Sequence, residues 1–104
     1  MNLETIIEYT AGASIRTVVF VYNDDDALVD PTSVLITWVD ANSEKKVDQE
    51  DIVSTGKLET GIFEHFYNTS ASSAKGWWNA LIEVIDGSGD TARTSHGKGS
   101  VEVT

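Results

Sequence analysis

Large apolar residues stand at every second position in two stretches of the chain, and this period is that of a β-strand rather than of a helix. The stretches cover residues 62–67 and 77–85, and each follows a glycine. In the second stretch, Trp78 is in phase with the apolar residues that follow it, whereas Trp77 points to the opposite side. We therefore predict two strands here, with Trp78 in the core and Trp77 on the surface.

Further segments have the β-branched and aromatic composition of strands, and turn-forming residues separate them. They cover residues 3–9, 15–22, 34–39, 47–52, and 91–94 continued by 100–103. Residues 15–22 are almost continuously apolar, as in a strand that is buried on both sides or nearly so. The charges of residues 47–52 are typical of the edge of a sheet. We expect the last strand to be interrupted around Gly97 and Gly99.

About seven short strands, regular turns and the lack of a helical period predict an all-β fold, namely an antiparallel sandwich of the immunoglobulin-like type. The 104 residues suffice for one ordinary domain, so we expect a single sandwich over residues 1–104. The sequence contains no cysteine, which excludes disulfides and thiolate metal sites.

The charge of the chain narrows the choice of partners. Seventeen acidic and seven basic residues give a net charge of -10. A field of this sign repels the phosphates of nucleic acids and the anionic surface of a membrane. No apolar run reaches the roughly 20 residues that a membrane-spanning helix needs. We therefore expect neither nucleic acid nor a membrane as a partner.

The predicted topology brings one group of carboxylates together. The loops after residues 15–22 and 77–85 would lie at the same end of the sandwich. These loops contain Asp24, Asp25, Asp26, Asp30, Asp86 and Asp90. Carboxylates in flexible loops are the ligands that Ca²⁺ prefers. The spacing does not match the helix-loop-helix calcium motif, and aspartates are also common turn formers. A calcium site is therefore one interpretation and solvated turns are the favoured one, with no other cofactor expected.

The tryptophans and histidines supply the remaining candidates. Exposed tryptophans can stack on sugar rings, but Trp38 and Trp78 are in phase with apolar neighbours, so only Trp77 is a candidate for surface binding. His65 belongs to a row of strand residues, and neither it nor His96 has the further ligands that a zinc site needs. We interpret His65 as structural.

Two further motifs complete the search for chemistry. Asn68, Thr69 and Ser70 form a glycosylation acceptor in a predicted turn. The sequence offers no nucleophile, base and oxyanion donors that would converge, so we predict no catalytic residues and no enzymatic activity.

Four segments carry a resemblance to a known kind of module. They are residues 27–34, 60–65, 75–78 and 86–89. Together they resemble an immunoglobulin-like module that recurs in structural proteins of tailed phages and archaeal viruses and in prokaryotic surface proteins. The chain departs from the usual pattern at Ala27, where a turn glycine is common, and at His65, where an aromatic residue is common. The resemblance implies a shape and transfers no catalytic residues.

The start of the sequence favours one branch of this resemblance. Its first residues have neither a basic segment nor an apolar segment of a secretion signal, and surface modules need export, whereas virion proteins assemble in the host cytoplasm. We therefore expect a virion protein that decorates the capsid or belongs to the neck or tail, with capsid or tail subunits as partners. The alternative is a cell-surface or periplasmic module that binds carbohydrate or protein through Trp77 and the acidic loop end.

Overall fold

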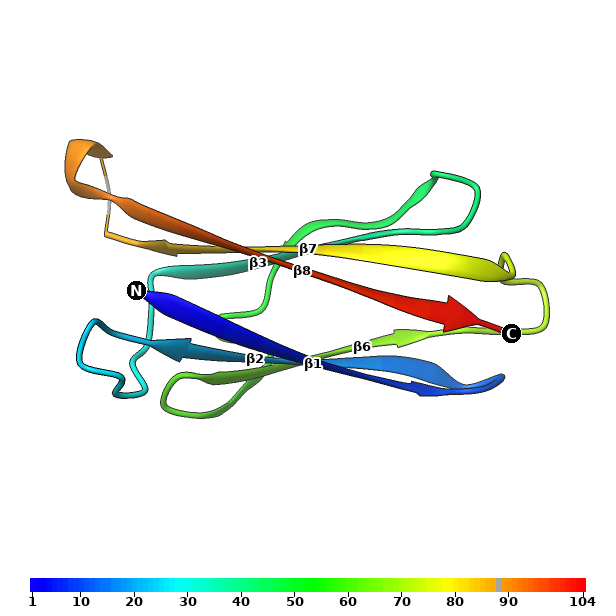
Figure 1. The fold of residues 1–104 in the computed structure, drawn as a ribbon, viewed down its shortest axis with the longest axis horizontal. Helices are drawn as coiled ribbons and strands as arrows, with labels where there is room; N and C mark the ends of the chain where they lie inside the picture. The colour runs from blue at the N-terminus through cyan, green and yellow to red at the C-terminus, as the bar shows by residue number, and fades with distance from the viewer. Residues whose placement is uncertain (88) are drawn as a thin grey trace.

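The computed structural model, which describes residues 1–87 and 89–104, contains two antiparallel four-stranded sheets packed face to face (Figure 1). The first sheet has the order β1 (Asn2–Thr10), β2 (Ser14–Tyr22), β6 (Ile62–Asn68) and β5 (Lys57–Glu59). The second has the order β4 (Lys45–Asp51), β3 (Ser33–Val39), β7 (Gly76–Asp86) and β8 (Arg93–Val103). A 3-10 turn, Gly89–Thr91, precedes β8.

The strand order confirms the predicted antiparallel, immunoglobulin-like sandwich. Constant-type immunoglobulin domains have the order ABED in one sheet and CFG in the other. The present sheets follow the same order, with β4 added beside β3, so the described part of the chain has eight strands rather than seven. Sequence patterns missed β5, and Ser88, in the predicted turn after β7, lies outside the described residues.

The core lies between the sheets and is built from alternate positions of the inner strands. Trp38 and Trp78 are fully buried there, as predicted, together with Phe63. The indole N–H of Trp78 donates a hydrogen bond of 2.9 Å to the carbonyl of Ala74, and its ring lies against that of Tyr67, with 5.5 Å between the centroids. The buried indole thus has both apolar neighbours and a partner for its one donor.

The predicted interruption of the last strand is wrong, because β8 continues through both glycines. Gly97 pairs with Ile82 and Gly99 pairs with Ala80 in an unbroken register. A Cβ atom at Gly97 would collide with Leu3, and one at Gly99 would collide with Ile7. These glycines therefore do not break the strand; they leave room for side chains of β1.

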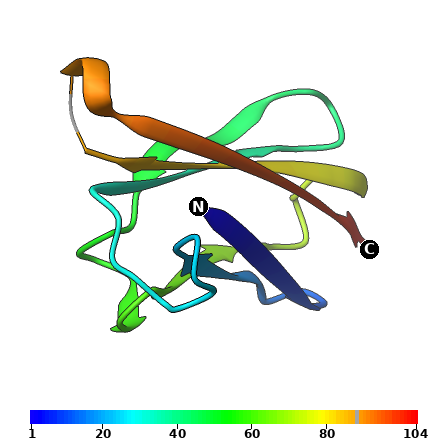
Figure 2. The same ribbon diagram turned by 60° about the vertical axis from the view of Figure 1, so that its left-hand side comes forward.

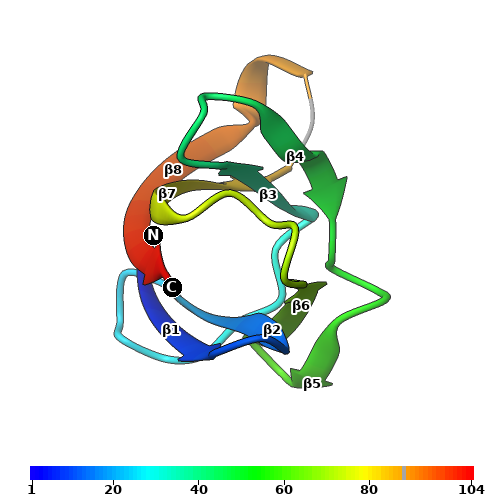
Figure 3. The same ribbon diagram turned by 90° about the vertical axis from the view of Figure 1, so that its right-hand side faces the viewer.

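The two sides of the sandwich are closed differently (Figures 2 and 3). On one side β1 lies beside β8, where the hydroxyl of Ser95 donates to the carbonyl of Met1 at 3.1 Å. On the other side β4 is an irregular edge strand, as its charges predict, and Gln49 has a left-handed φ of 47°. Among the described residues, no helix has the length and the apolar character that crossing a bilayer requires.

Candidate functional site

The loop after β2 and the turn after β7 lie at the same end of the sandwich, as the topology predicts (Figure 1). Two contacts tie the loops of this end together. Arg93, at the start of β8, places Nη1 3.4 Å from Oδ2 of Asp24. The backbone N–H of Gly87 donates to the hydroxyl of Thr32 at 2.9 Å.

Two cationic groups bind the carboxylate of Asp24. Its Oδ1 lies 2.7 Å from the amino nitrogen of Met1, and Arg93 approaches its other oxygen. The hydrogen bond from the amino group, followed by its charge and that of Arg93, holds the pKa of Asp24 below its ordinary value. This carboxylate therefore joins the loop to the beginnings of β1 and β8.

Asp30 has a different partner on the far side of the same loop. Its Oδ2 lies 2.6 Å from Nζ of Lys57, and its Oδ1 accepts a hydrogen bond of 2.9 Å from the N–H of Gly61. The bond from Lys57 is the main reason why the pKa of Asp30 lies below its ordinary value. Asp30 thus connects the loop to β5 and to the start of β6.

The aspartates between these two act in the turn itself. The side-chain oxygen of Asn23 accepts hydrogen bonds from the N–H groups of Asp25 and Ala27, at 2.9 and 3.0 Å. Asp26 has a left-handed φ of 59°, which aspartate tolerates better than most residues. These contacts are the turn chemistry that the sequence favoured for the segment.

The metal interpretation gains no support from the arrangement of the six aspartates. Asp86, the last residue of β7, and Asp90, in the 3-10 turn that precedes β8, are both exposed. Over residues 1–87 and 89–104, no group of three or more aspartate, glutamate, histidine or cysteine side chains is placed to hold a metal ion. Calcium binding at this end stays a prediction from the sequence.

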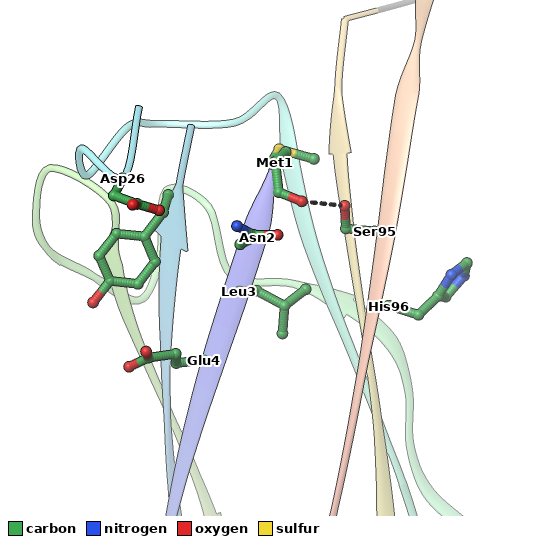
Figure 4. Close-up of a pocket in the computed structure, with 8 residues that line it drawn as sticks. Met1, Asn2, Leu3, Glu4, Asp26, Ser95 and His96 are labelled. Atoms are coloured by element: carbon green, nitrogen blue, oxygen red, sulfur yellow. Dashed lines mark hydrogen bonds between the residues drawn. The ribbon is translucent and has the colours of Figure 1, made fainter. Parts of the chain in front are cut away.

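An open hollow of about 660 Å³ lies next to this loop, between β1, the end of β2 and the start of β8 (Figure 4). Glu4 and Asp26 supply carboxylates to its lining, while His96 points away from the other labelled residues. Nε2 of His96 instead lies 3.3 Å from Oε2 of Glu83. The lining also includes Met1, whose amino group brings a positive charge to this end of the sandwich.

Of the three tryptophans, only Trp77 reaches the surface. Its side chain is 59% exposed on the outer face of the second sheet, and its cross-strand neighbour is Glu102. Trp38 and Trp78 are in the core, so the three rings form no common platform. Binding through Trp77 remains a prediction.

His65 is buried, with 7% of its surface exposed, and bridges the two sheets. Its Nε2 on β6 lies 3.0 Å from Oε2 of Glu50 on β4, and its Nδ1 has no hydrogen-bond partner within the described part of the chain. Burial lowers the pKa of His65, and the charge of Glu50 opposes this shift. No sequence pattern indicates this pair, because the two residues belong to strands of different sheets.

The glycosylation acceptor lies at the end of a strand. Asn68 is the last residue of β6 and is exposed, so the predicted turn begins one residue later. Thr69 is buried, and its N–H donates to the carbonyl of Ala13 at 2.8 Å.

The structure also reveals exposed apolar residues that were not among the candidates. Ile6, Leu58 and Phe66 belong to the first sheet, and each is about half exposed. The sequence signal for this apolar outer face is the run of four apolar residues at 18–21. A strand with only one buried face would alternate apolar and polar residues instead.

The fold and these sites define the chain as a β-sandwich protein whose candidate binding groups lie on its exterior. Comparison with known proteins finds no family model, no curated protein and no solved structure that matches the chain.

Proposed function

We propose that the protein is a non-enzymatic structural component of a virion that acts through protein–protein contacts. One observation carries the contact role: large apolar side chains are exposed on both outer faces of the sandwich. Ile6, Leu58 and Phe66 lie on the first sheet, and Trp77 and Leu81 lie on the second. Large apolar side chains exposed on the face of a sheet are a feature of sites where another protein binds.

The remaining properties of the chain suit such a role. A core of fully buried aromatic and β-branched side chains supports a rigid scaffold. The net charge of -10 favours solubility at the high copy number of a virion component. The virion assignment itself rests on the resemblance to immunoglobulin-like modules of phage and archaeal-virus structural proteins, with capsid decoration, neck or tail as its place.

The test is to locate the protein in infected cells of the host. Virions are purified on a density gradient, and their proteins are quantified by mass spectrometry beside the free cytosolic fraction. We expect the protein to band with intact particles at a fixed ratio to the capsid subunit. Recovery from the soluble fraction alone, with none in particles that retain their other structural proteins, would refute the assignment.

Trp77 favours a second candidate, a binding module of a cell surface or the periplasm. Its broadly exposed ring has the flat apolar face on which sugar rings stack. A glycan array probed with the wild-type protein and with Trp77→Ala tests this role, and Trp77→Phe, which keeps an aromatic face, is the matched control. Specific binding that Trp77→Ala loses and Trp77→Phe retains would favour this function over the first.

A further inference from the structure

We propose that the outer face of the first sheet docks a partner protein that presents apolar side chains surrounded by lysine or arginine. The apolar centre of this surface, called the outer apolar face below, comprises Ile6, Val18, Phe20, Leu58, Ile62 and Phe66. The inference rests on the proposed function only for the general role of protein contacts, and it adds the surface and the chemistry of the partner.

The register of the strands brings four residues of the outer apolar face together, whereas Glu64, opposite Val18, lies between Ile62 and Phe66 on β6. Ile6 lies opposite Val18 across the β1–β2 ladder, and Phe20 lies opposite Ile62 across the β2–β6 ladder. Directly opposed apolar residues of neighbouring strands are in contact distance. The outer face of an antiparallel sheet is normally polar when it faces water. We therefore expect a bound partner to shield these apolar residues from water.

The centre of the outer apolar face is shielded from solvent, whereas the side chains at its margin are exposed. Val18 is only 5% exposed although it points away from the core, whereas Ile6 and Leu58 are 48% and 50% exposed. A shallow hollow of about 490 Å³ lies between these side chains and has Ile62 in its lining. A partner side chain that enters this hollow would bury the exposed margins without a rearrangement of the sheet.

The composition of β2 gives a second, independent reason for a cover. Val18, Val19, Phe20 and Val21 follow one another without a polar residue, which is the pattern of a strand buried on both faces. The other sheet covers Val19 and Val21. Within residues 1–87 and 89–104, no further layer of strands or helices lies over the outer face of the first sheet (Figure 3), to which Val18 and Phe20 belong. A bound partner protein would bury the outer side of β2, as the apolar composition of this strand predicts.

The charges around the outer apolar face identify the kind of partner. Three carboxylates border it, those of Glu4, Glu8 and Glu59, and a fourth, that of Glu64, lies within it opposite Val18. Arg16 stands among them, and it is already bound by Glu64 at 2.6 Å and by Glu8 at 3.1 Å. An excess of negative charge therefore remains for a partner to neutralise.

The same charges argue against a second copy of this chain as the occupant. Two copies docked through this face would bring their acidic margins together, and each chain carries a net charge of -10. Like charges juxtaposed across an interface oppose association. A different protein with a basic margin avoids this repulsion.

The experiment uses ¹⁵N-labelled protein and two synthetic probe peptides. Both peptides have the same alternating leucine and isoleucine positions, and the positions between are lysine in one and glutamate in the other. We expect the lysine peptide to shift the amide signals of β1, β2 and β6 at the outer apolar face, with affinity at least about tenfold higher than that of the glutamate peptide. Raising the salt from about 50 to about 500 mM should weaken this binding.

Matched variants assign the binding to the face. Ile6→Ser with Leu58→Ser should lower the affinity at least about tenfold, because both side chains border the hollow. Asn79→Ser with Ser100→Ala changes two exposed, directly opposed positions of the opposite outer face and should leave the affinity unchanged. Glu4→Gln with Glu59→Gln should reduce the preference for the lysine peptide.

Three results would overturn the proposal: no shifts at the outer apolar face, equal affinity for both peptides, or sedimentation that shows a dimer which Ile6→Ser with Leu58→Ser dissociates. These readouts do not depend on virions. Absence of the protein from purified particles would remove the proposed function and leave a positive peptide result standing, and a negative peptide result would leave the particle test intact.

Discussion

The two sides on which the sheets meet differ in the chemistry that holds them together. On one side, Leu3 and Ile7 of β1 pack into spaces left by Gly97 and Gly99 of β8. On the other side, beside the segment that crosses from β4 to β5, the ionisable pair of His65 and Glu50 joins the sheets. We call the first the side closed by shape, because the packing of side chains against glycines joins β1 to β8. We call the second the side closed by charge, because two ionisable residues meet there. Substitutions that change volume should therefore affect the first, and changes of pH should affect the second.

The largest loss of stability is expected in the core that both sides enclose, and the smaller losses predicted for the two sides are compared with it. Trp78→Ala should lower the free energy of unfolding by about 3 to 5 kcal/mol, because it empties a fully buried site and removes the contact with Tyr67. Urea denaturation followed by circular dichroism measures this loss. Trp77→Ala, next in the chain but largely exposed, should cost much less. Similar losses for the two variants would contradict the observed strand phase.

The next largest effect is expected on the side closed by shape. Gly97→Val should destabilise the protein by about 1 to 3 kcal/mol in urea, because its side chain needs the space that Leu3 fills. Combining it with Leu3→Ala should restore part of the loss, since the smaller residue vacates that space. Ser100→Val, at an exposed position of β8, is the control and should change stability little. Strictly additive losses for Gly97→Val and Leu3→Ala would show that the two residues do not compete.

These expectations also show what the sequence contained about the fold. Alternation alone placed β6, β7 and the buried Trp78, because side-chain direction in a strand reports which face is covered. It missed β5, whose three residues, Lys57–Glu59, are all exposed and too few to show a period. It misjudged Gly97 and Gly99, because the reason for glycine there is a contact with β1, at the opposite end of the chain.

The candidate site was predictable only at the level of topology. The strand order brings the loops after β2 and β7 to one end, and the sequence predicted this correctly. It did not predict that Asp24 would meet Arg93 while Asp30 meets Lys57, because such pairs depend on how distant segments approach. The same holds for His65 and Glu50, which are remote in the sheet order.

A smaller effect, dependent on pH, is expected on the side closed by charge. Burial holds the pKa of His65 below the ordinary 6.5 of histidine, so the unfolded chain binds the proton more readily than the folded one. The stability from neutral His65 is therefore present above about pH 6.5 and is lost as the pH falls through the lowered value. The slope for one proton cannot exceed about 1.4 kcal/mol per pH unit. Urea denaturation at a series of pH values measures it.

Two variants separate His65 from the other groups that titrate in acid. His65→Gln should remove this component, so its stability should fall less steeply below pH 6.5 than that of the wild type. Glu50→Gln removes the charge that favours the protonated ring, so the pKa of His65 should drop further and the dependence should become steeper. If both variants reproduce the wild-type profile, the histidine pair does not govern the acid response of this side.

The smallest effect is expected from the polar contact at the end of the side closed by shape. The hydroxyl of Tyr9 donates to the carbonyl of Thr104 at 3.1 Å and accepts from its N–H at 3.3 Å. Both groups are exposed, so water replaces these bonds when the hydroxyl is removed. Tyr9→Phe should therefore shift the urea midpoint less than Gly97→Val does, while hydrogen exchange of the last β8 amides becomes faster. A loss as large as that of Gly97→Val would mean that hydrogen bonds, rather than the packing of Leu3 and Ile7 on the glycines, hold β1 to β8.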